Sequence, residues 1–316
     1  MTDSETLIVE MAEKYRNWGK WGSEDQLGTL NYITPAKISE AGQLVKSGKT
    51  FSLALPLDRN GPQTGRFNRH NPIHVMVSDG GDLRAPLALQ RCGVGFSDDM
   101  VTMSLQCATH WDALAHVFDH GKMWNGYDAR EVSSQGARYN GIEKTSPRLL
   151  SRGVLVDIAR FKGEDSLKDG YAITEEDLLG CIEAQGTSSQ IGRGDIVLIR
   201  TGHLGRSQGA KWSGYAGGDA PGLSFYTLDW LYRTEIAAIA TDTWGVEVRP
   251  NELPGSFQPL HQVAIPNIGL TLGEMFVLDE LAADCASDGI YEFLLSAPPL
   301  PFTGAVGAPV HPLALK

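Results

Sequence analysis

The chain has 316 residues, of which 42% are hydrophobic and 21% are charged, so it can bury a sizeable core as an ordinary globular protein. Its formal net charge of −11 repels phosphate backbones and anionic lipid surfaces, so we expect neither nucleic acid nor membrane as a partner. No apolar run reaches the roughly 18 residues of a membrane span, and the early acidic residues do not suit a secretory signal. The four cysteines lie far apart without a CxxC pair, which favours free thiols and a cytoplasmic location.

Residues 1–50 are predicted to form a partly helical extension. The best helix begins with Thr34 as the N-cap and a proline at the first helical position, and it is expected to end at Gly48. A strand is predicted at 51–55. Residues 58–72 are polar and rich in turn-forming residues, and a loop of this kind inside a compact chain is often functional. We therefore expect a long loop beside the pocket.

The rest of the chain mixes predicted helices and strands without strict alternation. Residues 101–118 are predicted to be extended. Apolar runs predict strands at 154–158, 195–200, 236–241 and 290–295, and helices are predicted at 174–182, 228–234 and 278–286. Thr174 is expected to cap its helix, with Asp177 three residues later. No repeat, low-complexity segment or composition shift marks a domain border, so we predict one α+β domain over residues 1–316 with a largely β core.

The polar side chains of one short segment carry the predicted chemistry. Gln106, His110, Asp112 and His116 are separated by four, two and four residues. If the segment is extended, these even spacings place all four side chains on the same face. Two imidazoles, one carboxylate and one amide oxygen suit a divalent metal ion of borderline or hard character. The small and apolar residues between them could form the dry wall that such a site needs.

Two other interpretations of this segment remain open on the residues alone. Short histidine motifs arise by chance, and a half-buried strand with surface histidines explains the pattern about as well. A thiol nucleophile is conceivable because Cys107 lies near His110. However, an odd separation places these two side chains on opposite faces of a strand, which disfavours the thiol.

The segment resembles the HxGTHxDxPxH signature of the cyclase family, the metal-dependent hydrolases that include bacterial kynurenine formamidase and isatin hydrolase. The match consists of Thr109, His110, Asp112 and His116. The first histidine of the signature is Gln106 in this chain, and its glycine and proline are replaced by alanine and leucine. The departure at Gln106 puts the identity and the number of metal ions in doubt.

A later block, residues 261–275, resembles the family segment in which a histidine and a glutamate complete the metal site, here His261 and Glu274. The predicted strand end at Asp242 and the opening segment around Trp18 also look like the longer members of the family. The resemblance runs over most of the chain. It implies a swivelling β/β/α-type single domain with a barrel-like mixed sheet flanked by helices. It also implies a homodimer or homotetramer, in which neighbouring subunits can contribute to the pocket.

The resemblance further implies a role for each matching residue. The implied metal ligands are Gln106, His110, Asp112, His261 and Glu274, and the implied catalytic residue is His116. An amide oxygen at Gln106 shifts the preference from zinc towards manganese, and from two ions towards one. The expected reaction is attack of metal-bound hydroxide on a cyclic amide, imide or lactone, or on a small amide, with His116 as the proton shuttle.

The expected substrate is a small molecule, cyclic or aromatic. Phe67, Trp111 and Trp244 are candidates to stack on a planar ring, although the core or a dimer interface is the more usual place for any one of them. His70 and His74 are candidates to line the pocket, and a surface loop explains them equally well. Three other functions stay open: a metal-dependent lyase or dehydratase on the same scaffold, an arylformamidase, and a non-catalytic metal-binding or small-molecule-binding protein.

Overall fold

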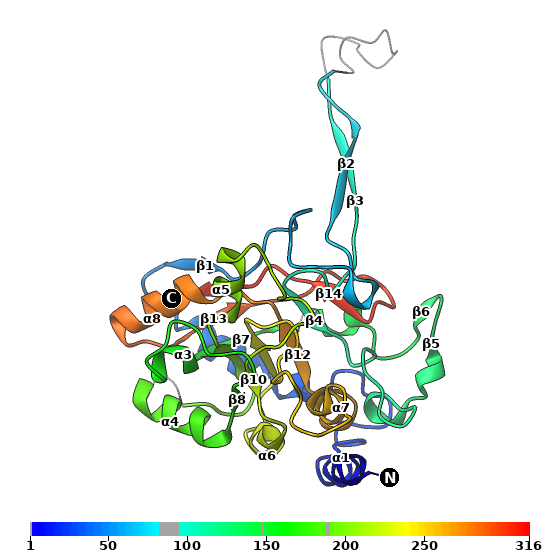
Figure 1. Cartoon of the computed structure of the whole chain (residues 1–316), viewed down its shortest axis with the longest axis vertical. Helices are drawn as coiled ribbons and strands as arrows, with labels where there is room; N and C mark the ends of the chain where they lie inside the picture. Colours follow the sequence, from blue (N-terminus) through cyan, green and yellow to red (C-terminus); the bar gives the residue numbers. More distant parts are fainter. Residues whose placement is uncertain (1, 82–94, 147, 187–189) are drawn as a thin grey trace.

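A curled, half-barrel sheet of nine strands forms the body of the protein, with helices on both of its faces and one long hairpin standing away from it (Figure 1). The structure is a computed structural model, and it describes residues 2–81, 95–146, 148–186 and 190–316. This architecture confirms the prediction of one α+β domain with a barrel-like mixed sheet flanked by helices.

The strands of the large sheet follow the order β1-β15-β13-β7-β9-β11-β12-β4-β14. Their bounds are β1 Thr50–Ser52, β4 His110–Asp112, β7 Leu150–Asp157, β9 Ile196–Arg200, β11 Ala238–Thr241, β12 Thr271–Glu274, β13 Glu292–Ser296, β14 Gly307–Pro309 and β15 Leu313–Leu315. Three small two-stranded sheets pair β2 Ile73–Ser78 with β3 Asp98–Thr102, β5 Val132–Ser133 with β6 Gly136–Ala137, and β8 Ala172–Ile173 with β10 Gly222–Leu223.

Eight α-helices lie in the described part of the chain. Their bounds are α1 Asp3–Lys14, α2 Pro35–Gly42, α3 Ile158–Phe161, α4 Glu175–Gln185, α5 His203–Gly209, α6 Leu228–Arg233, α7 Pro259–Val263 and α8 Asp279–Asp288. The helices predicted at 174–182, 228–234 and 278–286 correspond to α4, α6 and α8 and are confirmed. The predicted capping box also forms, because the Thr174 hydroxyl accepts from Asp177 N and the Asp177 carboxylate accepts from Thr174 N.

Four parallel strands, β7, β9, β11 and β12, make the centre of the sheet. Parallel strands covered on both faces are apolar on both sides. In β9, Val197 and Ile199 belong to the core shared with α4, α6 and α7, whereas Ile196 and Leu198 belong to the core shared with α8. The short apolar runs of the sequence are therefore strands that serve two cores at once.

The predicted helix after Thr34 is shorter than expected. Thr34 caps it as predicted, because its hydroxyl accepts from Lys37 N at 3.2 Å, but the helix ends at Gly42 instead of Gly48. The following segment lies along the C-terminal strand, since Ser47 N and Gly48 N both donate to the carbonyl of Lys316. These hydrogen bonds require the chain to leave the helix early.

The prediction that residues 101–118 are extended is wrong for most of the segment. Only the end of β3 and the three residues of β4 are strand. A turn in which Cys107 N donates to Ser104 O precedes β4, and a turn in which His116 N donates to Ala113 O follows it. Sheet pairing stops because Ala115 N donates to Asn140 O instead of to a neighbouring strand.

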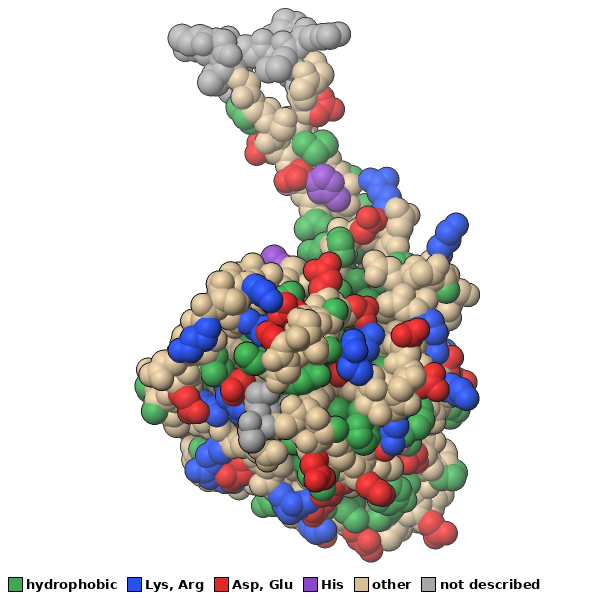
Figure 2. Space-filling model, turned by 90° about the vertical axis from the view of Figure 1, so that its left-hand side faces the viewer, with side chains coloured by type: hydrophobic (Ala, Val, Ile, Leu, Met, Phe, Trp, Pro, Cys, Tyr) green, Lys and Arg blue, Asp and Glu red, His purple; other side chains and the backbone are tan. Residues whose placement is uncertain are grey.

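The hairpin of β2 and β3 forms an arm that projects from the body (Figures 1 and 2). Ile73, Val75 and Met100 lie on one face of this arm and are 59%, 44% and 53% exposed. Figure 2 shows apolar side chains along the arm and a histidine beside them. Within the part of the chain that the structure describes, no helix is long and apolar enough to cross a membrane.

Candidate metal centre and substrate cavity

Strand pairing between β4 and β12 joins the two halves of the predicted site. His110 on β4 lies directly opposite Glu274 on β12 in the antiparallel register. Opposite residues of an antiparallel pair project from the same face of the sheet. Asp112, two residues after His110, shares that face. Residues more than 160 positions apart in the sequence are thus brought together by one cross-strand pair.

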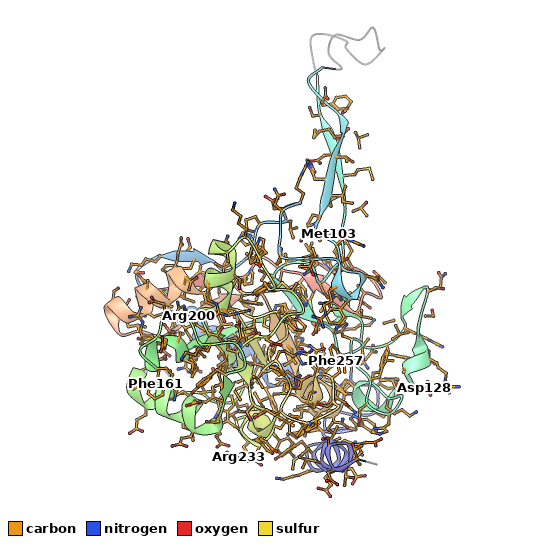
Figure 3. The ribbon with its side chains drawn as sticks, viewed as in Figure 1. Met103, Asp128, Phe161, Arg200, Arg233 and Phe257 are labelled. Atoms are coloured by element: carbon orange, nitrogen blue, oxygen red, sulfur yellow. The ribbon has the colours of Figure 1, made fainter. Side chains whose placement is uncertain are left out.

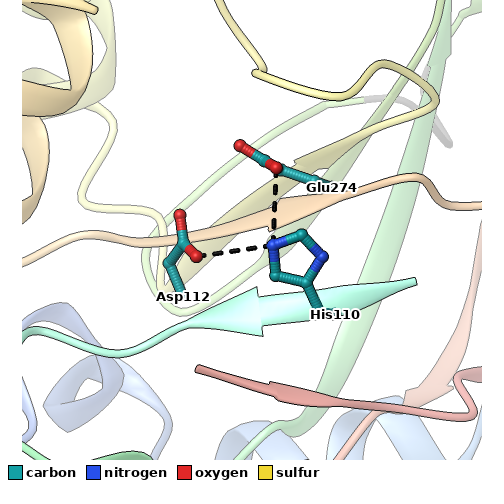
Figure 4. Close-up of side chains that lie close together, drawn as sticks. All are labelled: His110, Asp112 and Glu274. Carbon is teal, nitrogen blue, oxygen red and sulfur yellow. Dashed lines mark ion pairs between the residues drawn. The ribbon is translucent and has the colours of Figure 1, made fainter. Parts of the chain in front are cut away.

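The ligand atoms of these three side chains converge in a buried place (Figure 4). His110 Nε2 lies 3.4 Å from Asp112 Oδ1 and 3.4 Å from Glu274 Oε2. One ligand atom from each residue can be chosen so that all lie within 4.8 Å of one another. His110 Nε2 and Asp112 Oδ1 have no hydrogen-bond partner among the described residues, although both are buried. Buried polar atoms are rarely left unpaired, and a divalent cation would satisfy both.

The tautomer of His110 is compatible with metal binding. Its Nδ1 lies 2.8 Å from the carbonyl oxygen of Ala108, to which only a protonated nitrogen can donate. The lone pair of the neutral ring is therefore on Nε2, the atom that faces Asp112 and Glu274. Metal-binding histidines are commonly oriented in this way by a carbonyl or carboxylate on the opposite nitrogen.

His261 reaches the same cluster from α7, and Glu247 holds it there. The Glu247 carboxylate accepts from the backbone N–H groups of Leu260 and His261, at the start of α7. It also lies 2.6 Å from His261 Nδ1. This contact directs His261 Nε2 towards Glu274 Oε1, 3.3 Å away. We call His110, Asp112, His261 and Glu274 the carboxylate–imidazole cluster.

Turns, rather than strand alternation, bring the two remaining predicted residues to the cluster. His116 follows the turn after β4, and its Nε2 lies 3.7 Å from Asp112 Oδ1 while 23% of its side chain is exposed. Gln106 lies in the turn before β4 and lines the same cavity. A Cβ on Gly307 of β14 would come within 2.7 Å of Gln106 Nε2, so the glycine makes room for this amide.

A cavity of about 720 Å³ opens beside the cluster. Gln106, Asp112, His116, His261 and Glu274 line it together with residues from other segments. Four of those residues are aromatic, namely Phe118 and three rings that contact one another. Phe67 lies 6.0 Å from Trp244 and 5.8 Å from Phe257, measured between ring centroids. Arg69 also lines the cavity. We call Phe67, Arg69, Trp244 and Phe257 the aromatic wall; Phe257 is labelled in Figure 3.

Opposing influences set the pKa values in the cluster. Burial raises the pKa of Asp112, but His116 and His110 outweigh it and hold this pKa below its ordinary value. Burial lowers the pKa of His261, but hydrogen bonds to Glu247 and Glu274 outweigh it and raise the pKa to about 10. A cation held by His261 and Glu274 would take the place of the proton between them. Burial, opposed by Asp112 but reinforced by Arg69, lowers the pKa of His116.

Several candidates from the sequence lie away from the cavity. Trp111 is fully buried in the sheet core and donates from Nε1 to Ala297 O, so it is unavailable to a substrate. His74 lies on the arm and pairs with Asp99, and His70 is exposed; neither lines the cavity. Burial raises the pKa of Cys107 to about 11, which disfavours a thiolate nucleophile.

Asp242 follows directly after β11, the neighbour of β12 in the sheet, and its carboxylate has a structural role. Its carboxylate accepts from Thr201 N, Thr201 Oγ1 and Gly202 N at 2.6 to 2.8 Å. These hydrogen bonds occupy the carboxylate and tie the end of β11 to the end of β9.

Two residues that sequence reasoning missed are Glu247 and Arg69. Neither belongs to a recognisable motif, and only the position of Arg69 in the predicted pocket-side loop pointed to it.

Comparison with known proteins places this site in a family. Residues 51–248 match the model of the family described as "Putative cyclase". A crystal structure of a novel cyclase is 39% identical, covers 96% of this chain and 99% of its own, and superposes with a TM-score of 0.86. No protein of curated function matches the sequence.

More distant structures share the fold. Isatin hydrolase A from Ralstonia solanacearum is 17% identical, with 90% of this chain and 98% of its own covered, and a TM-score of 0.63. Isatin hydrolase A from Labrenzia aggregata, bound to benzyl benzoate, is 18% identical, with 84% and 93% covered and a TM-score of 0.60. With the family model over most of the chain and the 39% identical structure over nearly all of it, the chain belongs to the cyclase family.

Proposed function

We propose that this protein is a divalent-metal-dependent hydrolase that opens a cyclic amide, imide or lactone, or cleaves a small amide. One observation carries the proposal: the buried atoms His110 Nε2 and Asp112 Oδ1, which lack hydrogen-bond partners among the described residues, converge with Glu274 at the wall of a large cavity. Membership of the cyclase family supports it, as do the fold relatives named isatin hydrolase.

The carboxylate–imidazole cluster would hold the metal ion, with Gln106 as a further oxygen ligand. A bound divalent ion lowers the pKa of water and polarises a carbonyl group, which is the chemistry that amide or lactone hydrolysis needs. We propose manganese, because an amide oxygen at the position of a family histidine favours a harder ion than zinc. Two tightly held zinc ions per chain, found in protein purified without added metal, would contradict this assignment.

His116 is proposed to move the proton between the attacking water and the leaving group. Its Nε2 lies beside Asp112, and part of its side chain faces the cavity, so it can contact both the cluster and a bound substrate. A histidine in this position can accept a proton and then donate it to the departing nitrogen or oxygen. Asp112 would orient the ring, and the aromatic wall would keep bulk water from the reacting carbonyl.

The test is a panel of cyclic imides, lactams, lactones and formanilides, assayed by mass spectrometry with manganese or zinc restored. We expect at least one cyclic substrate to gain one molecule of water. Products that have lost water or another small molecule would instead identify a lyase and overturn the hydrolase assignment. Measuring metal content in the same samples shows whether inactive preparations are simply metal-free.

We also propose that the chain assembles with a second copy of itself through the arm of β2 and β3. A two-stranded hairpin alone is marginally stable in water, and this one exposes Ile73, Val75 and Met100 on one face. Light scattering of the full chain should therefore give the mass of a dimer or tetramer. Val75→Lys should lower that mass, whereas a monomer at all concentrations would contradict the proposal.

A further inference from the structure

The aromatic wall differs in chemistry from the carboxylate–imidazole cluster, because it is apolar and cationic. Phe67, Trp244 and Phe257 form a chain of ring contacts in the cavity lining, where Phe67 and Phe257 are 46% and 54% exposed and Trp244 is 3% exposed. Trp244 is fixed in place because its Nε1 donates to Gly218 O at 3.1 Å. The ring planes are inclined by 32° and 56°, so together they present an apolar aromatic surface against which the face of a planar ligand can pack.

Arg69 lines the same cavity as these rings, and its charge has no partner among the described residues. Its side chain has no ion pair and no hydrogen bond with any residue that the structure describes, although it is half-buried on the cavity wall. Its neighbours differ: Arg66 donates to Gly217 O, and Arg249 donates to Asn251 and lies over the rings of Trp244 and Phe257. A guanidinium held partly away from water without an anion is costly, unless a ligand supplies the anion.

The backbone holds this arginine in position before any ligand arrives. Phe67 and Asn68 both have a φ of 57°, in the left-handed region that residues other than glycine rarely adopt. The loop is nevertheless anchored on both sides, by Arg66 on Gly217 O and by His70 N on Ser104 Oγ at 2.9 Å. Strained conformations that persist under such anchoring are typical of ligand-binding positions.

The acidic residues on the cavity wall restrict where an anion can bind. Asp112 and Glu274 line the cavity on the side of the cluster, and they repel a carboxylate that is not bound to a cation. Arg69 attracts one, and its planar guanidinium can bind both carboxylate oxygens. A substrate whose scissile carbonyl lies at the cluster can therefore place a carboxylate on its ring at Arg69.

We propose that Arg69 and the rings of Phe67, Trp244 and Phe257 form a specificity subsite for a planar substrate that carries a carboxylate away from the bond to be hydrolysed. This subsite rests on the proposed hydrolase function for its role in catalysis, but its ligand preference can be measured without turnover. Arg69 acts here as a specificity-determining residue and not as a group that takes part in the proton transfer.

The test uses phthalimide-4-carboxylate and its methyl ester, which share the same scissile imide. With metal-loaded protein, Arg69→Gln should raise KM for the carboxylate about tenfold or more and change KM for the ester about twofold or less. Arg69→Lys should restore part of the preference, because it keeps the charge but loses the planar fork. Arg59→Gln is the matched control, since Arg59 is exposed on the preceding loop and does not line the cavity. Equal losses on both substrates would overturn the proposal and assign Arg69 to the reacting group.

Calorimetry with metal-loaded His116→Ala separates this proposal from the hydrolase function. Phthalimide-4-carboxylate should bind this variant about tenfold more tightly than its methyl ester does. A second substitution, Arg69→Gln, should abolish this difference in affinity. If that difference is measured but no imide is hydrolysed by the unmodified protein, the subsite stands and the hydrolase proposal fails for imides. If carboxylate and ester bind equally, or neither binds, the subsite is wrong even where hydrolysis is observed.

Discussion

The carboxylate–imidazole cluster and the aromatic wall line the same cavity but are built in different ways. The cluster stands mainly on paired strands, where the register between β4 and β12 sets His110 opposite Glu274. The aromatic wall stands on connecting segments, including the left-handed residues Phe67 and Asn68. Regular elements hold atoms to the tolerance that metal binding needs, whereas loops can vary and so set substrate preference. Substitutions in the cluster should therefore affect metal and turnover, and substitutions in the wall should affect substrate binding.

The largest effect that separates proton transfer from metal binding is expected at His116. His116→Ala should lower kcat by about 10²- to 10⁴-fold, because the positioned proton acceptor is lost. Metal content should stay at the unmodified level, as measured by elemental analysis of the same sample. His74→Ala is the matched control, since His74 pairs with Asp99 on the exposed arm, and its kcat should not change. Loss of metal from His116→Ala would make His116 a ligand instead.

A smaller effect is expected at Glu247, which supports the cluster through His261. Glu247→Gln should weaken metal binding about 10- to 100-fold, because the orienting carboxylate on His261 Nδ1 is lost. Competition against a chelator of known affinity measures this directly. Glu252→Gln is a close control, because Glu252 also accepts from a backbone N–H, that of Phe225. Its other donor is the hydroxyl of Ser224 and not a histidine of the cluster. An equal loss of metal affinity in both variants would indicate general destabilisation.

On the aromatic wall, Trp244→Leu should raise KM for aromatic substrates by roughly three- to tenfold, while metal content stays constant and kcat changes little. The expected loss is that of one ring contact in a site that keeps its other rings. Phe161→Leu serves as the control, because Phe161 lies on α3 away from the cavity and is labelled in Figure 3. A large fall in kcat for Trp244→Leu, with KM unchanged, would contradict the division between cluster and wall.

The smallest effect concerns the packing behind the aromatic wall. His203 stacks on Tyr215, which belongs to the same buried group as Trp244, and burial together with Arg206, against the opposing Asp169, lowers the pKa of His203 to about 4. In the unfolded chain His203 binds a proton near pH 6.5, whereas in the folded protein it does so only near pH 4. The contribution of His203 to the free energy of unfolding is therefore fully present above about pH 6.5 and is lost as the pH falls towards about 4. The contribution is at most about 3 kcal/mol. Thermal unfolding from pH 7 to pH 4 should be less pH-dependent in His203→Gln, and an unchanged dependence would refute this role.

The sequence predicted the cluster better than the wall, for physical reasons. His110 and Asp112 could be placed together because side chains two apart in a strand share a face. Thr174 and Asp177 likewise fixed the start of α4 through a local capping pattern. His261 and Glu274 required the family resemblance, because only the β4–β12 register brings them to His110. Their roles as metal ligands, like that of Gln106, stay predictions.

The errors arise where tertiary contacts override local pattern. Gln106 and His116 reach the cavity through turns on either side of β4, although their even spacing suggested one continuous strand. Trp111 has the odd position that a strand places on the opposite face, and it lies in the core. Arg69 and Glu247 carry no local pattern: Arg69 is defined by its place on the cavity wall, and Glu247 by its contacts with the start of α7.

The most direct test of the account is the metal dependence of the carboxylate–imidazole cluster. Protein stripped with a chelator should lose activity on every hydrolysed substrate of the panel and regain it with manganese, at about one ion per chain. Asp112→Asn should neither hold that ion tightly nor recover, whereas Asp242→Asn should keep the ion and lose only stability, because Asp242 bonds to Thr201 and Gly202. Full activity in metal-free protein, or normal metal binding by Asp112→Asn, would contradict the assignment of this cluster as the metal centre.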